Sequence, residues 1–455
     1  MKMKRLLRIA SVVSMLLLIG SMTCFSASVP EPAYPKVAGN VTLTWWSWTS
    51  NAEKIAAEFT KVYPNIKIVH PLIGSGMNEY TKLQTVLQAG SGAPDVVQIE
   101  FQYLPQFIDT GGLLDISKYA KRYKPYFLDW TWAQCSRGSK LYAIPEDIGP
   151  LGFLYRPDVF RQAGLTVPKT YQDLAADAAK FHQANPQKFY TFFPLNDPGY
   201  TTGLFWQAGA RPFQYVSGGW KVNINDAAAK KVLNFWGDLV KKGYVKATND
   251  WTPQWQSEIG SGLYGCMIGA AWSPSYELQP YVRPETANWN AADIPQWTAG
   301  AFKNGNWGGS TNAVTTQCKN SAAAVLFAAW LNTSRTGIDK ALQMESQGGR
   351  GLFSANKYAP ENPLFSAPSP ALANQVASAV WTKAANAVNV SFQWSPWTDY
   401  VYKQLNTELT KASQNEQTWA QALDRVQANT VGFAKSMGYK IVSNPGESGA
   451  IIASR

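Results

Sequence analysis

The hydrophobic pattern near residue 41 predicts a strand that leads into a helix. Because alternate residues of a strand point to opposite faces, one face carries Val41, Leu43 and Trp45, and the other carries Thr42, Thr44, Trp46 and Trp48. Ser50 and Glu53 have the S-x-x-E spacing of a capping box, which marks a helix start. We therefore expect Trp45 in the core, and Trp46 and Trp48 at the carboxyl end of a strand, where open α/β sheets bind ligands.

The alternation of strands and helices continues along the chain. Ile55, Phe59 and Val62 recur at helical spacing, Pro64 ends that helix, and residues 65–70 predict the next strand. Strand, helix and strand in succession indicate a parallel sheet. Further helices are predicted at 80–90, 103–112, 167–184, 225–243, 320–334 and through most of 397–438, with a strand at 93–100. The helix at 167–184 opens with Thr170 and Asp173 in a box-like arrangement. The chain is therefore predicted to be α/β.

The N-terminus has the composition of an export signal. Residues 1–8 are basic, and the apolar stretch Ile9–Gly20 has signal-peptide length. Small residues at Ser26 and Ser28 favour cleavage after Ser28, which gives a signal peptide at 1–28. Lipidation at Cys24 is the alternative, although "SMTC" matches the usual lipoprotein pattern poorly. Either route predicts a protein of the cell envelope, on the extracellular face of the membrane or in the periplasm.

The charge of the chain does not indicate a nucleic-acid partner. The formal net charge is +11, and without the four basic residues of 1–8 it is +7. That charge is spread along the chain and forms no run of Lys and Arg, so it is typical of a solvated surface.

Aromatic residues change the picture more than charge does. Charged residues make up 16% of the chain, below the roughly 25% of average soluble domains, whereas 19 residues are Trp. Many aromatic residues fall at the ends of predicted elements, among them Trp46, Trp48, Phe101, Tyr103, Trp206, Trp272, Trp307, Trp394 and Trp397. Sugar rings pack their C–H faces on aromatic planes and leave hydroxyls for hydrogen bonds. The composition therefore favours an aromatic-lined, charge-poor carbohydrate cleft.

Residues for catalysis or metal binding are sparse. His70 and His182 have no partner at metal-ligand spacing, and no phosphate loop occurs, so we expect no metal and no cofactor. Glu146 and Asp147 are adjacent, so on an extended segment they point to opposite faces and cannot flank one bond as a pair. Three further cysteines leave two alternatives open, a disulfide between two of them or free thiols: Cys135, Cys266 and Cys318.

Four segments, in order, carry a family resemblance. The segments 89–116 and 141–181 resemble the G-x-x-P-D-V…G-L-L-D-L and Y-x-x-P…L-x-Y-N-x-D-x-F…A-G-L blocks of extracellular solute-binding proteins that serve bacterial ATP-binding-cassette sugar importers. The segments 259–272 and 306–331 are similar to the G-x-A-A-M…W and G-G…S-K-N…F-x-x-W-L blocks of the same family, which includes maltose-binding-protein-like receptors. Arg156 departs from this pattern, because it stands where the family commonly has Asn.

The resemblance implies a two-lobed periplasmic-binding-protein fold. A ligand cleft lies between the lobes, which close about a hinge, and the chain crosses that hinge more than once. The first crossing is expected near 145–156 and the return near 308–317. The implied division is 41–148 plus 308–365 for the N-terminal lobe, and 149–307 plus 366–440 for the C-terminal lobe.

The resemblance also implies a function without catalysis. A monomeric receptor would bind a small carbohydrate and deliver it to a membrane permease of the importer. Carried over position by position, the ligand-binding residues are expected to be Trp46, Trp48, Glu100, Phe101, Glu146, Asp147, Trp272, Trp307, Gly308, Gly309 and Arg350, and the aromatic pattern adds Trp206.

Three functions stay open at this point. The first is a receptor for a neutral sugar, more specifically an oligosaccharide, because several aromatic rings suggest several sugar rings. The second is a secreted glycosidase or lyase that uses carboxylates. The third is a binding protein for a phosphorylated polyol that uses Arg156 or Arg350.

Overall fold

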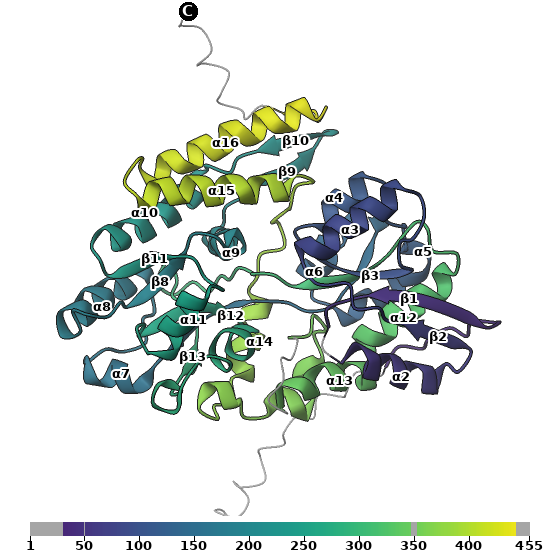
Figure 1. Ribbon diagram of the computed structural model, residues 1–455, viewed down its shortest axis with the longest axis horizontal. Coiled ribbons are helices and arrows are strands. Elements are labelled where there is room, and N and C mark those ends of the chain that lie inside the picture. The colour runs from purple at the N-terminus through teal and green to yellow at the C-terminus, as the bar shows by residue number, and fades with distance from the viewer. Residues whose placement is uncertain (1–30, 50, 347–352, 443–455) are drawn as a thin grey trace, which may run out of the picture. The chain divides into compact units, whose positions relative to one another are not determined.

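The structure is a computed structural model that describes residues 31–49, 51–346 and 353–442 (Figure 1). The chain divides into the units Met1–Glu31 and Pro32–Arg455, and all elements named below belong to the second unit. The expected signal peptide 1–28, Cys24, Ser50 and Arg350 lie outside the described residues.

The first sheet is built from strands that are distant in the sequence. Its order is β2-β1-β3-β14-β6. β1 (Val41–Trp46) pairs in parallel with β2 (Ile66–Val69) and β3 (Val96–Glu100), through the connecting helices α2 (Ala52–Val62) and α3 (Met77–Gln88). β14 (Ser310–Val314) pairs antiparallel with both β3 and β6 (Ala143–Pro145). The predicted strand–helix–strand start is confirmed, and β14 shows that the chain returns to this sheet late.

Trp45 of β1 lies in the core. Trp45 is fully buried, donates its Nε1 hydrogen to Oδ1 of Asn312 at 3.2 Å, and meets Phe327 edge-on, so its predicted core position is confirmed. The following helix begins at Ala52, after Asn51 with a left-handed φ of 59° and no side-chain cap. This start is one residue later than the capping box at Ser50 requires.

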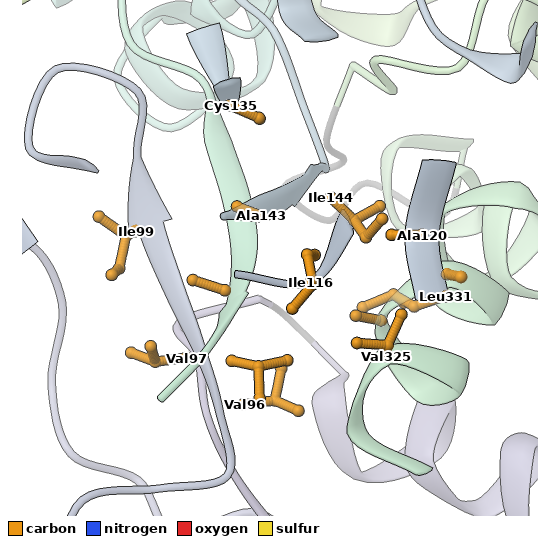
Figure 2. Close-up of a cluster of buried hydrophobic side chains, with 14 of the residues drawn as sticks. Val96, Val97, Ile99, Ile116, Ala120, Cys135, Ala143, Ile144, Val325 and Leu331 are labelled. Carbon is orange, nitrogen blue, oxygen red and sulfur yellow. The ribbon is translucent and has the colours of Figure 1, made fainter. Parts of the chain in front are cut away.

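One face of the first sheet packs on a helix that is apolar along most of its length. Figure 2 shows Val96 of β3 on the side of Val325 of α12 (Ser321–Thr333), whereas Val97 and Ile99 of β3 point away from that helix. A helix that is apolar all round is buried on all sides, and α12 is buried from Ala323 to Thr333. Burial of each Val, Leu or Ile side chain contributes about 1.5–3 kcal/mol. Smaller elements complete this part: α4 (Leu104–Asp109), α5 (Ser117–Ala120), α6 (Asp129–Gln134), β4 (Ser136–Arg137), β5 (Lys140–Leu141) and α13 (Arg335–Ser346).

The second group of strands has its own core. β7 (Leu151–Tyr155) pairs antiparallel with β12 (Cys266–Ala270) and β13 (Asn290–Ala292). β8 (Thr191–Pro194) pairs in parallel with β11 (Val245–Thr248), and β9 (Phe213–Val216) forms a hairpin with β10 (Gly219–Val222). The helices around these strands are α7 (Pro157–Gln162), α8 (Tyr171–Ala184), α9 (Pro198–Ala208), α10 (Ala227–Lys241), α11 (Pro253–Gly260), α14 (Ser378–Asn386), α15 (Thr398–Ser413) and α16 (Trp419–Ser436).

The capping box predicted for α8 is present. Thr170 accepts the N–H of Asp173 on its hydroxyl at 3.1 Å, and the Asp173 carboxylate accepts the N–H of Thr170 at 2.9 Å. Two N–H groups that the helix itself cannot satisfy are paired in this way, so the local sequence alone defines where α8 begins.

The chain crosses between the two groups of strands first within the expected segment 145–156, and then before β14, which occupies most of the segment 308–317 where the return was expected. It passes from β6 to β7, and it returns between β13 and β14. These crossings lie side by side, because Pro150 and Asn306 form an isolated bridge and Trp307 donates its N–H to the carbonyl of Gly149 at 2.8 Å. The crossing segments are therefore tied together beside the site described below.

Two further observations concern the cysteines and the helices. Cys135, Cys266 and Cys318 are free thiols, so of the two alternatives the structure has the thiols. Across residues 31–49, 51–346 and 353–442, the helices are all too short or too polar to cross a bilayer.

Candidate functional site

A cavity of about 550 Å³ lies at the carboxyl ends of strands from both groups. Trp48 follows β1, Glu100 ends β3 and Asp147 follows β6. From the second group, Asp197 follows β8, and the loops after β11 and β12 contribute Trp251 and Trp272. Open α/β sheets bind ligands at this end of their strands, so the topology itself makes this cavity the candidate site.

One wall of the cavity consists of three indole rings. The ring centroids of Trp272 and Trp307 lie 4.6 Å apart, and those of Trp251 and Trp272 lie 6.3 Å apart with 32° between their planes. Trp272 donates its Nε1 hydrogen to the carbonyl of Trp307 at 3.0 Å, and Trp307 donates its own to Oδ1 of Asp197 at 3.2 Å. Both indole N–H groups are therefore engaged inside the protein.

Trp251 completes this wall from an unusual backbone position. Its φ is 57°, in the left-handed region that large side chains rarely adopt, and its side chain is 38% exposed. It stands directly before Thr252, whose hydroxyl caps α11 by accepting the N–H of Trp255 at 3.2 Å. Strained residues of this kind cluster at functional sites, and the strain here turns the ring toward Trp272.

Aromatic side chains also line the cavity beside the first sheet. Trp48 is half-buried and meets Tyr80 edge-on, with 6.1 Å between ring centroids. Tyr103, directly before α4, meets Tyr402 of α15 edge-on at 6.3 Å. Aromatic rings therefore reach the cavity from both groups of strands.

Three carboxylates face the cavity in fixed orientations. Glu100 accepts hydrogen bonds from the hydroxyl of Tyr80 at 3.1 Å and from Nε2 of Gln102 at 2.9 Å. Asp147 accepts the N–H of Ser310 at 2.7 Å, and Asp197 accepts the N–H of Tyr200 at 3.1 Å, which caps α9. These bonds hold the carboxylates where they are.

Burial shifts the titration of these groups. It raises the pKa of the Glu100 carboxyl to about 7, an effect that the nearby carboxylates Asp147 and Asp197 strengthen and hydrogen bonds oppose. Burial likewise raises the pKa of Asp147 to about 6 and raises that of Asp197 above its usual value. Burial disfavours the charged form of an acid, so Glu100 and Asp147 titrate closer to neutral pH than ordinary carboxyl groups do.

The cavity is not charge-poor, contrary to the sequence-based expectation. Glu100, Asp147, Asp197 and Asp399 line it, and among the described lining residues the one cation is Lys403. Lys403 pairs with Asp399 through a contact of 2.7 Å. The low charge content of the whole chain did not reveal this, because the few acidic residues are concentrated at one place. Within the described part of the chain, no group of three or more His, Cys, Asp or Glu side chains could hold a metal ion.

The structure brings most of the expected ligand-binding residues together. Those that line the cavity are Trp48, Glu100, Asp147, Trp272, Trp307, Gly308 and Gly309. Those that do not line it are Trp46, Phe101, Glu146 and Trp206. Arg350 lies outside the described residues.

Two of the expected tryptophans are packed within the protein. Trp46 is 4% exposed, with Nζ of Lys82 5.3 Å from its ring centroid, because α3 covers the face of β1 that was expected to be open. Parallel strands are commonly buried on both faces. Trp206 stacks on Phe392 with 4.3 Å between centroids and donates its Nε1 hydrogen to the carbonyl of Asn389 at 2.7 Å.

The neighbours Glu146 and Asp147 point to different surroundings, as expected for an extended segment. Asp147 lines the cavity, whereas Glu146 is buried beside it and accepts a hydrogen bond from the hydroxyl of Thr49 at 2.8 Å. Burial raises the pKa of the Glu146 carboxyl to about 8. Phe101 is also buried and packs on Trp130. Glu146 and Phe101 are therefore buried next to the residues that line the cavity.

The two glycines at the cavity serve the protein's own backbone. Gly308 and Gly309 have φ values of 71° and 88°, which favour glycine. A Cβ on Gly309 would lie 2.8 Å from the carbonyl oxygen of Asp147. Gly309 also approaches the backbone of Asp147 closely, and Ser310, the next residue, donates its N–H to that carboxylate. The expected approach of this backbone to a ligand stays a prediction.

Several lining residues were not expected from the sequence. Asp197 precedes Pro198 as a helix cap followed by proline, a pattern that marks a helix start and could have located this residue. Asp399, Tyr402, Lys403 and Asn406 share one face of α15 by helical spacing. Nothing in the local sequence says that this face borders the cavity.

Comparison with known proteins identifies the family. Residues 45–337, well over half of the chain, match the family described as bacterial extracellular solute-binding protein. The chain belongs to this family. This solute-binding protein therefore has the two-lobed α/β fold of periplasmic binding proteins, as the sequence predicted.

Individual relatives agree with the family. The chain is similar to the ABC transporter associated binding protein from B. animalis subsp. lactis Bl-04 in complex with beta-1,6-galactobiose, at 26% identity and a TM-score of 0.75, over 88% of this chain and 99% of that one. The galacto-N-biose-/lacto-N-biose I-binding protein from Bifidobacterium longum shares its fold at 22% identity and a TM-score of 0.77, over 90% and 100%.

A curated relative matches over a shorter stretch. The arabinooligosaccharide-binding protein of Halalkalibacterium halodurans is 23% identical over 272 residues, which is 57% of this solute-binding protein and 59% of the relative. The match therefore spans less than two thirds of that relative's length.

Proposed function

We propose that this solute-binding protein is the receptor of an ATP-binding-cassette importer, that it binds an oligosaccharide in the cavity, and that it delivers the sugar to a membrane permease without catalysis. The observation that carries this proposal is the wall of Trp251, Trp272 and Trp307 beside oriented carboxylates. The flat faces suit the C–H faces of sugar rings, and the carboxylates accept hydrogen bonds from sugar hydroxyls.

The cavity suits an oligosaccharide in size and in arrangement. Its volume of about 550 Å³ falls within the roughly 300–1,000 Å³ of small-molecule sites. The indole wall and Trp48 rise from different strand groups, so two or more sugar rings could each meet an aromatic face. The relatives named above, whose bound or named ligands are galactobiose, lacto-N-biose and arabinooligosaccharides, support this ligand class.

The proposed ligand contacts are the expected residues that line the cavity, namely Trp48, Glu100, Asp147, Trp272, Trp307 and the backbone of Gly308 and Gly309. We add Asp197, Trp251 and Tyr402 to them. The proposal extends to the lobe limits 41–148 plus 308–365 and 149–307 plus 366–440. It also includes a monomeric protein exported to the cell envelope by the segment 1–28, with Cys24 as the alternative lipid anchor.

A secreted glycosidase or lyase is the second candidate. One observation favours it: Glu100 and Asp147 share the cavity, and burial raises their pKa values to about 7 and about 6, as catalytic acids require. The third candidate, a binding protein for a phosphorylated polyol, is not supported by Arg156. This residue is 5% exposed, pairs with Asp158 at 2.8 Å, and does not line the cavity.

Intrinsic tryptophan fluorescence, titrated with a panel of neutral oligosaccharides, tests the proposal. We expect a saturable change, with the sugar recovered intact from the mixture by chromatography. Cleaved product would establish the enzyme instead. A fluorescence change with a phosphodiester, and with none of the neutral sugars, would mean that the ligand is a phosphorylated compound and not a neutral oligosaccharide.

A further inference from the structure

Carboxylates are prominent among the polar groups that line the cavity. Glu100, Asp147 and Asp197 present carboxylates. Gln102 also lines the cavity and is 5% exposed; its Nε2 donates to Glu100, and its Oε1 is buried without a partner. Because the bond to Glu100 fixes the amide orientation, the unpaired atom is an acceptor. A buried acceptor without a partner is costly, so this atom calls for a donor from a ligand.

Two of the three indole donors of the aromatic wall are already used. The indole N–H of Trp272 is bound to a backbone carbonyl, and that of Trp307 is bound to Asp197. These two side chains can therefore offer a ligand their ring faces, which carry negative charge density, but not their N–H groups. Carboxylates beside open ring faces attract cations.

The positive charge at the cavity is committed elsewhere. Lys403 binds Asp399 at 2.7 Å on the same helix face, and 68% of its side chain is exposed. Among the described residues, no ion pair is formed by Glu100, Asp147 or Asp197. When ionised, the three carboxylates thus leave a negative potential that the described side chains do not neutralise. Because burial raises the pKa of Glu100 to about 7 and that of Asp147 to about 6, this potential is stronger at pH 8 than at pH 6.

We infer that the cavity prefers oligosaccharides that carry a protonated amine over their neutral counterparts, and that it rejects those that carry a carboxylate. This inference rests on the proposed function and narrows its ligand class. An ammonium group supplies up to three N–H donors to the carboxylates and to Oε1 of Gln102, and it can lie against the indole faces. A uronic acid would bring a further carboxylate close to Glu100, Asp147 and Asp197, while Lys403 is paired with Asp399.

A matched ligand series tests the inference. For each linkage that binds as a neutral disaccharide in the fluorescence panel, three forms are titrated at low salt: the neutral sugar, its 6-amino-6-deoxy analogue and its 6-uronic acid. We expect the amine to bind about tenfold more tightly than the neutral sugar, and the uronic acid about tenfold more weakly. A tenfold change corresponds to roughly 1.4 kcal/mol, which is less than the interaction energy between two unit charges about 4 Å apart near a protein surface.

Two variants separate cavity charge from general charge. Asp197→Asn keeps the helix cap, and it should reduce the ratio of the affinities for the amine and for the uronic acid by about tenfold. Asp238→Asn removes an exposed carboxylate of α10 that pairs with Lys242, and should leave the difference unchanged. Equal affinity of the neutral sugar and the uronic acid, or no gain for the amine, would overturn the inference while the proposed function stands. Failure of every neutral sugar to bind would overturn both.

Discussion

Trp307 donates its indole hydrogen to Oδ1 of Asp197 at 3.2 Å. The same oxygen accepts the N–H of Tyr200 in the first turn of α9. One carboxylate therefore caps a helix and positions an aromatic wall of the cavity. The orientation of Trp307 thereby depends on where α9 begins.

This double role predicts different effects for two substitutions of Asp197. Asp197→Ala removes the cap and the indole acceptor, and should lower the free energy of unfolding by about 1 kcal/mol while weakening sugar binding. Asp197→Asn retains a capping oxygen, so its stability should stay near that of the wild type. Urea unfolding monitored by circular dichroism, together with fluorescence titration, measures both effects. Equal stability of the two variants would contradict the role in capping.

The neighbours Trp46 and Trp48 should respond differently to truncation. Trp48→Ala removes a half-buried ring that lines the cavity, so it should weaken binding with little loss of stability. Trp46→Ala empties a buried site next to α3, so it should destabilise by about 3–5 kcal/mol. Thermal unfolding and ligand titration of both variants test the pair, and each serves as the control for the other. The reverse pattern would mean that Trp46 is the ligand contact.

Gly309→Ala should disturb the cavity by way of the backbone. The new Cβ would lie 2.8 Å from the carbonyl of Asp147 at a φ of 88°, so the turn that brings Ser310 to Asp147 has to move. We expect a loss of about 1–3 kcal/mol in stability and weaker binding. Gly300→Ala is the matched control, since Gly300 has a φ of 77° and nothing within 4 Å of its Cβ position. Equal losses of stability in the two variants would mean that the positive φ causes the effect, and not the contact with the carbonyl of Asp147.

Buried carboxyl groups should make the protein less stable at alkaline pH. Burial raises the pKa of Glu79 and of Glu277 to about 8, and that of Asp250 to about 9. The pKa values of these three groups are higher in the folded than in the unfolded protein. Their contribution to the free energy of unfolding is therefore complete below about pH 4.5 and is lost as the pH rises through 8–9. The thermal midpoint should fall by several degrees between pH 5 and pH 9. Glu277→Gln should flatten that fall, and an unchanged slope would contradict its raised pKa.

The parts of the structure that the sequence predicted are those set by local patterns. The strand Val41–Trp46 follows from alternation, and the start of α8 follows from the Thr170–Asp173 box. Trp48 could be placed at the cavity because it follows a strand at its carboxyl end, and Asp147 and Trp272 because their segments resemble blocks of the family.

The parts that could not be predicted depend on packing between distant segments. Alternation in β1 separates Trp45 from Trp46, but it does not tell that α3 covers the second face. Likewise, the helical spacing of Asp399 and Tyr402 predicts a shared face of α15, but not that this face borders the cavity. The negative charge of the cavity has the same origin, since Glu100, Asp147 and Asp197 are far apart in the sequence.

Isothermal titration calorimetry of neutral oligosaccharides into the wild-type protein and into Trp272→Ala tests the central claim most directly. Trp272 is the middle ring of the indole wall, in contact with both Trp251 and Trp307. The account predicts one sugar bound per wild-type chain, recovered intact, and an affinity at least about tenfold weaker in the variant, the worth of a lost aromatic contact of roughly 1.5 kcal/mol. No heat of binding with any oligosaccharide, or equal affinity of the two proteins, would contradict it.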